Sequence, residues 1–304
     1  MSNHTPACFA HHMGLYLVEP RWFQSAQAML RMTPDHVMQA YNPGEAYQNY
    51  LNAEPIVDRT DLYGITASGI ATIPVIGLMT KGASKFGTST LDVRRALNQA
   101  VNDPKVKAIM LHMDTPGGSF AGLDELAADI RTAAGFKPLH AHADDLIASA
   151  GMYAGSQASR LTINRAGEAG SIGTYAVLED SSGAAEIQGI KVHLFSTGEM
   201  KGMGAPGVPI TEPQIARMQQ MVDNAQQFFN KAIMDGRGLD KQQVAELVAD
   251  GGVYFAAEAK KRGLVDAVES YSEALDKLAS KISKRSATPR RNAAAVKARV
   301  LALK

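Results

Sequence analysis

From Gly69 to Val268 the sequence alternates short apolar segments with amphipathic ones, and this rhythm limits the possible folds more than any other feature. Residues 70–76 and 106–113 have the composition of buried strands, and residues 88–101 between them have the apolar spacing of a helix. Strands that alternate with helices of about 10–15 residues form βαβ units, in which neighbouring strands are parallel. The sequence therefore predicts an α/β fold with a mostly parallel sheet.

The same patterns predict the remaining elements and give the C-terminal part a helical character. Further helices are expected at residues 121–134, 149–159, 182–189, 211–234, 239–247 and 256–262. Further strands are expected at residues 138–143, 160–164, 191–195, 252–255 and 264–268.

Three regions follow from this pattern. Residues 1–62 form an N-terminal extension with short helices, residues 63–272 form the α/β domain, and residues 273–304 form a basic, flexible tail. Residues 281–304 carry eight Lys or Arg side chains and no Asp or Glu. Such a segment is typical of a solvated, disordered end, or of a basic interaction arm.

Composition narrows the class of protein. The formal net charge of +1 gives no overall field for nucleic acid, and the single cysteine, Cys8, excludes an intrachain disulfide framework. No apolar run reaches the roughly 18 residues of a membrane span, and the first residues lack the order of a secretory signal. We therefore expect a cytoplasmic protein with no membrane span and no specific nucleic-acid partner.

Ser149 lies where an apolar stretch gives way to small residues and then to a helix-like run. A serine in front of a helix is most often an N-cap. At this position its hydroxyl would also lie in the positive field of the helix N-terminus, and the N–H of Ala150 would face an oxyanion formed on attack. The small residues Ala148 and Gly151 leave room for a substrate backbone. We interpret Ser149 as a nucleophile and Ala150 as an oxyanion donor.

Lys201 lies in a glycine-bearing loop, between Gly198 and Gly204. A serine hydroxyl attacks only when a base removes its proton, and a lysine can be that base when its amine is neutral. Met200 and Met203 can cover the amine, and burial favours the neutral form. We interpret Lys201 as the general base.

Ser171 lies in the turn-like sequence Gly-Ser-Ile-Gly at residues 170–173. Its hydroxyl could donate to or accept from the Lys201 amine and so orient it. An ordinary turn serine explains the residue equally well.

The sequence Asp-Thr-Pro-Gly-Gly at residues 114–118 follows a predicted strand. Two adjacent glycines leave backbone N–H groups unobstructed beside a scissile carbonyl, although a plain strand-to-helix turn would also use them. Gly118 is the first choice for the oxyanion donor and Gly117 the second.

Histidines offer rival interpretations. His140 and His142 share one face of a predicted strand and could be metal ligands or the base of a Ser-His-Asp triad, but no third ligand is spaced nearby. Cys8, His11 and His12 suggest a metal site at the N-terminus, but their spacing is poor and a fourth ligand is missing. We therefore predict no metal and no cofactor.

Together these motifs resemble the signal peptide peptidase A family of serine peptidases, the protease IV clan with S49-type Ser-Lys chemistry. Five motifs carry the resemblance in one order: Met-Asp-Thr-Pro-Gly-Gly at 113–118, Ala-Ser-Ala-Gly-Met-Tyr at 148–153, Ala-Gly-Ser-Ile-Gly at 169–173, Gly-Glu-Met-Lys-Gly at 198–202 and Ala-Lys-Lys-Arg-Gly-Leu-Val-Asp at 259–266. The resemblance implies a ClpP/crotonase-like fold and peptide-bond hydrolysis through an acyl-enzyme. It assigns Ser149 as nucleophile, Lys201 as general base and Gly118 to the oxyanion hole, within a catalytic domain at residues 63–272.

Within that family the chain resembles especially the soluble head maturation proteases of tailed phages and prophages, because we find neither an N-terminal anchor nor a tandem duplication of the catalytic unit. This implies protein or peptide substrates, scaffold and capsid proteins among them, and a homo-oligomer in which neighbouring subunits share sites. Two alternatives stay open: a cytoplasmic, signal-peptide-peptidase-like enzyme that degrades proteins or peptides, and a non-catalytic oligomeric scaffold on the same fold. An acyl-CoA enzyme of the crotonase type is a third, although it has no use for a Ser-Lys pair.

Overall fold

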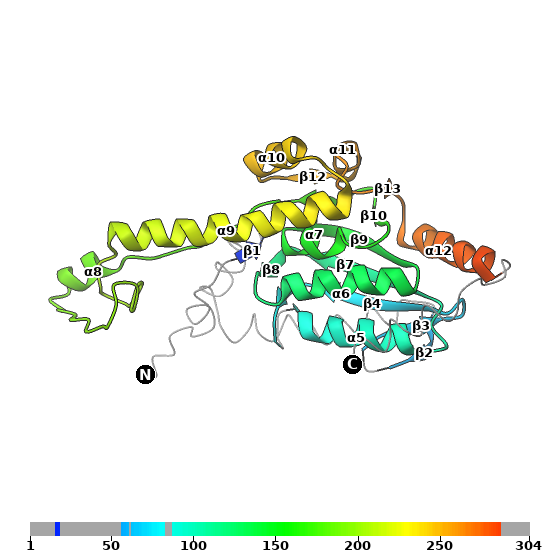
Figure 1. The fold of residues 1–304 in the computed structure, drawn as a ribbon, viewed down its shortest axis with the longest axis horizontal. Helices are drawn as coiled ribbons and strands as arrows, with labels where there is room; N and C mark the ends of the chain where they lie inside the picture. Colours follow the sequence, from blue (N-terminus) through cyan, green and yellow to red (C-terminus); the bar gives the residue numbers. More distant parts are fainter. Residues whose placement is uncertain (1–15, 19–55, 61, 83–86, 287–304) are drawn as a thin grey trace.

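The computed structural model describes residues 16–18, 56–60, 62–82 and 87–286. They form an α/β body, from which one long helix and the segment before it extend as an arm (Figure 1).

A main sheet forms the centre of the body. Its strands are β2 (Ile56–Arg59), β3 (Gly64–Thr66), β4 (Ile70–Ile76), β7 (Ala108–Thr115), β9 (Leu139–Ala148), β10 (Leu161–Ile163), β11 (Glu168–Gly170), β12 (Val253–Phe255) and β13 (Ala267–Val268). Their order across the sheet is β12-β11-β9-β7-β4-β3-β2, with β10 paired to β9 and β13. The central pairs β4–β7, β7–β9 and β9–β11 are parallel, whereas β12, β3 and β2 add antiparallel pairs at the two ends. This confirms the predicted α/β class and its mostly parallel sheet.

A second, smaller sheet lies beyond the end of β7. Its strands are β1 (Tyr16–Val18), β5 (Leu78–Thr80), β6 (Gly87–Ser89) and β8 (Gly117–Ser119). They are ordered β1-β8-β5-β6, and β1 is antiparallel to β8 whereas β5 is parallel to both of its neighbours. Of these four strands, the sequence patterns predicted none.

Of the eight helices in the described residues, seven follow the predicted order and α12 was not predicted. They are α5 (Thr90–Asn102), α6 (Leu123–Phe136), α7 (Ala150–Gly155), α8 (Ser182–Ile187), α9 (Glu212–Arg237), α10 (Lys241–Asp250), α11 (Ala256–Lys261) and α12 (Tyr271–Ser286). Local signals fix several ends: the Ser89 hydroxyl accepts the N–H of Asp92 and caps α5. Gly238, with φ of 66°, ends α9, because a left-handed residue there costs glycine little.

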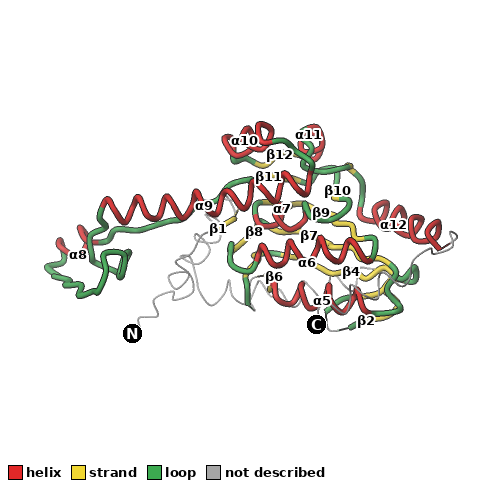
Figure 2. The backbone as a smooth tube through the Cα atoms, viewed as in Figure 1, coloured by secondary structure: helices red, strands yellow, loops and turns green. Residues whose placement is uncertain are grey.

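Both faces of the main sheet are covered, as Figure 2 shows for the helices around its strands. Side chains alternate along a strand, so Ile109 and Leu111 of β7 enter the large core with α5, α6 and α7, whereas Ala108 and Met110 face the other way. On that second face they pack against Leu278 and its neighbours in α12. The central strands of the sheet are therefore packed on both faces.

Helix α12 corrects the predicted domain boundary. Residues 273–286 were expected in a flexible basic tail, but they belong to a helix whose Ala274, Leu278 and Ile282 are buried against β4 and β7. Apolar residues at i, i+4 and i+8 outweigh the charges between them, because one buried stripe is enough to hold an amphipathic helix. The rest of the expected tail, residues 287–304, lies outside the described residues.

Two further expectations differ from the structure. Residues 191–195 form no strand and are exposed, with Phe195 93% accessible. The N-terminal region at residues 1–62 was expected to carry short helices apart from the domain, yet its described parts, β1 and β2, each pair with a sheet. The remainder of that region, including Cys8, His11 and His12, lies outside the described residues.

Candidate active site

Ser149 sits at the sharp turn between β9 and α7. Its backbone has φ of 52° and ψ of −113°, a combination rarely adopted by residues other than glycine, and its N–H donates to the carbonyl oxygen of Gly170 at 2.9 Å. The residue is fully buried, and its hydroxyl has no hydrogen-bond partner. It makes no N-cap bond to α7, so the simple capping interpretation does not apply.

Three parallel strands bring their end residues to one edge of the sheet. Thr115 of β7 is in register with Ile147 of β9, and Ala148 of β9 with Gly170 of β11. Gly117 and Ser149 each lie two residues beyond the first pair. In open parallel sheets, this carboxyl edge is where sites form.

The glycines after β7 are tightly enclosed. A Cβ on Gly118 would lie 1.8 Å from the backbone oxygen of Met79, so only glycine fits beside β5. Gly117 has φ of 101°, and its N–H donates to the hydroxyl of Thr115 at 3.1 Å. The Gly117 donor is therefore engaged within the loop, whereas Gly118, the first candidate for the oxyanion hole, lies in β8 between β1 and β5.

The segment at the end of β7 and the turn at Ser149 contact one another directly. A Cβ on Gly151 in α7 would lie 2.6 Å from the Thr115 side chain. The Thr115 hydroxyl in turn donates to the carbonyl oxygen of Gly77 at 2.6 Å, which fixes the start of the loop. The structure thus brings Gly117, Gly118, Ser149 and Ala150 to one place.

Ser171 follows β11 and lies beside Ser149. It is buried, has φ of 54°, and its N–H donates to the carbonyl oxygen of Gly252 at 2.6 Å. Ser171 therefore lies at the same edge of the sheet as Ser149, next to the turn that Ser149 forms.

Lys201 lies apart from these residues, on the arm. It is exposed, and its N–H donates to the carbonyl oxygen of Gly198 in a tight turn. The neighbouring Glu199 carbonyl oxygen accepts from the Gln214 side chain at 2.7 Å, which ties this turn to the first residues of α9. Met200 is 40% accessible, so the expected covering of the Lys201 amine does not occur within one chain.

The length of α9 sets the distance between Lys201 and Ser149 within one chain. Phe229 of α9 packs on Tyr153 of α7, with ring centroids 5.4 Å apart. Gln214 lies fifteen residues earlier, which is about 22 Å along a helix with a rise of 1.5 Å per residue. Figure 1 shows this part of α9 extending away from the body. One chain therefore does not place Lys201 beside Ser149 or Ser171.

The histidines lie on the other face of the sheet, under α12. His142 bonds through its two ring nitrogens to Thr162 and Asn164, at 2.8 and 3.2 Å. Burial lowers the pKa of His142 to about 4, and it does the same for His140. Since the Ser149 hydroxyl has no partner, neither histidine forms the rival triad, and the described part of the chain holds no cluster of three metal-ligating side chains.

Asp114 is a residue whose placement the sequence patterns did not reveal. It is half-buried in β7, and its carboxylate accepts the N–H of Leu146, three residues before Ser149, at 3.1 Å. The bond spans an irregularity in the β7–β9 register between Met113 and Thr115. Burial, and then repulsion from Asp144 and Asp145, raises the pKa of Asp114 to about 6.

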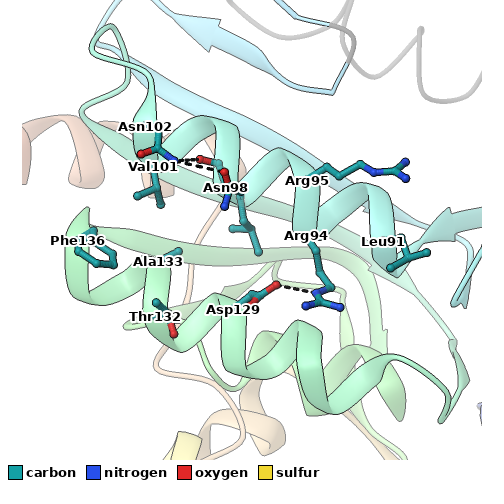
Figure 3. Close-up of a pocket in the computed structure, with 11 residues that line it drawn as sticks. Leu91, Arg94, Arg95, Asn98, Val101, Asn102, Asp129, Thr132, Ala133 and Phe136 are labelled. Atoms are coloured by element: carbon teal, nitrogen blue, oxygen red, sulfur yellow. Dashed lines mark hydrogen bonds and ion pairs between the residues drawn. The ribbon is translucent and has the colours of Figure 1, made fainter. Parts of the chain in front are cut away.

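A groove of about 570 Å³ lies elsewhere, between α5 and α6 on the outer face (Figure 3). Arg94 and Asp129 form an ion pair across it at 2.6 Å. Its lining contains no member of the Ser149 site, so we do not assign the chemistry to it.

Known proteins similar to this chain support one family. Capsid assembly protease C of Escherichia phage lambda is 32% identical over 213 residues, which cover 68% of this chain and 48% of that protein. Protease 4 of Haemophilus influenzae is 27% identical, over 80% of this chain and 39% of that protein. The chain thus spans about half the length of the curated relatives it matches.

Among solved structures, ClpP1 from Listeria monocytogenes aligns with 67% of this chain and 94% of its own, at 15% identity and a TM-score of 0.42. Among the described residues, no helix is both long and apolar enough to cross a membrane. A family model described as peptidase family S49 matches residues 132–284, half of the 304 residues. The chain belongs to peptidase family S49.

Proposed function

We propose that this chain is a serine endopeptidase with Ser149 as its nucleophile. One observation carries the proposal: the Ser149 hydroxyl is fully buried without a hydrogen-bond partner, on a backbone with positive φ. A buried unpaired hydroxyl costs about 1–3 kcal/mol, and a non-glycine residue in such a conformation costs about 1–3 kcal/mol. A fold keeps both costs where the residue acts, and a purely structural scaffold would have no reason to keep them.

The neighbouring groups support an acyl-enzyme mechanism with a Ser-Lys dyad. The Ser149 Oγ attacks the scissile carbonyl carbon while its proton passes to the neutral amine of Lys201. The N–H groups of Gly118 and Ala150 stabilise the oxyanion. As the C–N bond breaks, Lys201 returns the proton to the leaving amine. Water then attacks the ester carbon while Lys201 accepts one of its protons. As the bond from the carbonyl carbon to the Ser149 Oγ breaks and the acid product leaves, Lys201 returns that proton to the Ser149 Oγ.

Because Lys201 lies far from Ser149 within one chain, the dyad requires a neighbouring copy. The arm exposes large apolar side chains: Val177 (60%), Ile187 (89%), Ile190 (53%), Phe195 (93%), Ile215 (48%) and Phe228 (53%). Large apolar side chains exposed together on one part of a protein are typical of a protein–protein contact. The arm of one copy therefore packs on the body of the next, in a homo-oligomer, and carries Lys201 to that copy's Ser149. Ser171 of that copy forms a hydrogen bond with the Lys201 amine, as donor or as acceptor.

The substrates we propose are the scaffold and capsid proteins of a phage or prophage, cleaved during head maturation. The similarity to a phage capsid assembly protease supports this role. The similarity to Protease 4, whose name carries no capsid role, keeps open the alternative of a signal-peptide-peptidase-like enzyme that degrades proteins or peptides.

A serine-directed fluorophosphonate probe tests the chemistry. We expect mass spectrometry to find the probe on Ser149 of the wild type, and no label in Ser149→Ala. Ser182→Ala, in the exposed helix α8, is the matched control and should label like the wild type. Equal labelling of Ser149→Ala would refute the assignment. Cleavage of purified capsid and scaffold proteins, compared with cleavage of casein, then separates head maturation from general degradation.

A further inference from the structure

The outer edge of β8 holds a short strand from the N-terminal part of the same chain. β1 runs antiparallel to β8, with Tyr16 opposite Ser119, Leu17 opposite Gly118 and Val18 opposite Gly117. Figure 1 shows β1 beside β8, although about one hundred residues separate them in the sequence. One of the two glycines it faces, Gly118, is the residue we propose for the oxyanion hole.

The position of β1 is the one an extended peptide would take. The other side of β8 is already paired with β5, through Met79 and Gly118, so β1 fills the remaining edge. Extended peptides commonly bind proteins by adding a strand to such an edge, where main-chain hydrogen bonds supply affinity. The segment Tyr-Leu-Val is uncharged and rich in residues that favour strands.

The burial of Ser149 agrees with an occupied site. Its exposed fraction in the single chain is 0%, so a substrate carbonyl cannot reach the hydroxyl in this arrangement. A peptide that binds along β8 would have to take the place of β1.

We infer that the outer edge of β8 is a strand-addition site for an extended, uncharged peptide segment, and that residues 16–18 occupy it as an internal competitor. The expected consequence is that β1 slows acylation of Ser149. This consequence rests on the proposed function, whereas the pairing of β1 with β8 does not. Substrates gain access by displacing β1.

Paired variants of the full chain test the inference. Tyr16→Pro with Leu17→Pro removes both backbone N–H donors, so it breaks the β1–β8 ladder whichever residue donates. Tyr16→Val with Leu17→Val keeps the donors and the strand preference. We expect amide hydrogen exchange at Gly117, Gly118 and Ser119 to be at least about tenfold faster in the proline variant than in the valine variant, as when a protecting ladder opens. We also expect faster fluorophosphonate labelling of Ser149.

A synthetic peptide of residues 13–20 supplies the complementary measurement. Added in excess to the proline variant, it should restore slow exchange of β8 and slow labelling, whereas the same peptide with proline at positions 16 and 17 should do neither. A variant that lacks residues 1–18 should behave like the proline variant, and it serves if the proline variant does not fold. Equal exchange of β8 in the proline and valine variants would overturn the strand site. Equal labelling rates in the two would overturn the competition. If no variant labels at Ser149, the proposed function fails instead, and exchange alone decides whether β1 occupies the edge.

Discussion

Ser149 and Ser171 leave two adjacent parallel strands at the same level, and both have positive φ, 52° and 54°. The Ser149 N–H donates to the carbonyl oxygen of Gly170, directly before Ser171, and the Ser171 N–H donates to that of Gly252. Each unusual turn is thus fixed by a backbone bond to a neighbouring segment. Two adjacent residues with strained backbones are typical of a functional edge, which agrees with the site we propose here.

Strain at Ser149 predicts that glycine there is more stable than alanine. Glycine adopts φ of 52° without a Cβ clash, so Ser149→Gly should exceed Ser149→Ala in free energy of unfolding by about 1 kcal/mol, after the entropy that glycine loses on folding. Both variants should lose peptidase activity by several orders of magnitude. Urea unfolding checks the first result. A glycine variant less stable than the alanine variant would show that the turn is not strained.

The packing of Gly118 predicts that even one methyl group is not tolerated. In Gly118→Ala the new Cβ would meet the Met79 carbonyl oxygen at 1.8 Å, so β5 and β8 must separate. We expect a loss of at least about 2 kcal/mol in stability, and loss of activity. Gly135→Ala is the matched control, because nothing lies within 4 Å of its Cβ position in α6, and it should gain about 0.5–1 kcal/mol. Thermal unfolding of the two variants should shift in opposite directions.

The sequence predicted the parts of the fold that depend on local periodicity. The strand predicted at 70–76 matches the structure, and the helix predicted at 88–101 is found at Thr90–Asn102, because the spacing of apolar residues is encoded within a few residues. The small sheet escaped prediction, because strands such as Gly117–Ser119 consist of small residues with no alternation and depend on partners far along the chain.

Lys201 shows most clearly what the sequence patterns could not predict. Its neighbours Met200 and Met203 predicted a buried amine, but the loop lies at the far end of a helix of 26 residues. Sequence periodicity gives the length of that helix and not its direction from the body. Asp114 escaped for a similar reason, since its bond to Leu146 depends on an irregular register between two strands.

The half-buried carboxylate of Asp114 leads us to expect that removing its charge increases the free energy of unfolding at high pH. Folding raises its pKa from 3.8 to about 6, chiefly through burial, so the folded chain binds this proton more tightly than the unfolded chain. The corresponding stability is present below about pH 4 and is lost as the pH rises through 6. Asp114→Asn keeps an oxygen that accepts from Leu146 and cannot ionise. It should gain on the order of 1–2 kcal/mol at pH 8, allowing for partial exposure, and nothing at pH 4. Asp276→Asn, an exposed carboxylate in α12, is the control and should show no such trend in denaturant titrations.

For His140 we expect the opposite dependence of stability on pH, with the loss at low pH. Burial, and then the charges of Lys281 and Arg160, lowers its pKa from 6.5 to about 4, against smaller effects from Glu269 and Asp266. The stability it contributes is present above pH 6.5 and is lost as the pH falls through 4. His140→Leu removes this loss and a ring nitrogen with no partner. Its advantage over the wild type should therefore be about 1 kcal/mol larger at pH 5 than at pH 7.5, allowing for partial exposure. An advantage that does not change with pH would show that His140 is not buried in its neutral form.

The position of Lys201 on the arm predicts that two inactive variants restore each other. Ser149→Ala retains Lys201, and Lys201→Met retains Ser149, so each should be inactive alone. If a site combines Ser149 of one copy with Lys201 of the next, random exchange of subunits at equal concentration rebuilds about a quarter of the sites in a closed ring. We expect about that fraction of wild-type peptide hydrolysis after the two are mixed under conditions that allow exchange. Lys201→Met mixed with the Ser149→Ala, Lys201→Met double variant contains no intact lysine and must stay inactive. Wild-type subunits mixed with the double variant show, through falling activity, that exchange has taken place. With exchange shown in this way, a mixture of the two single variants that stays inactive would place both residues of the dyad in one chain, and the arm would then have to fold back onto its own body.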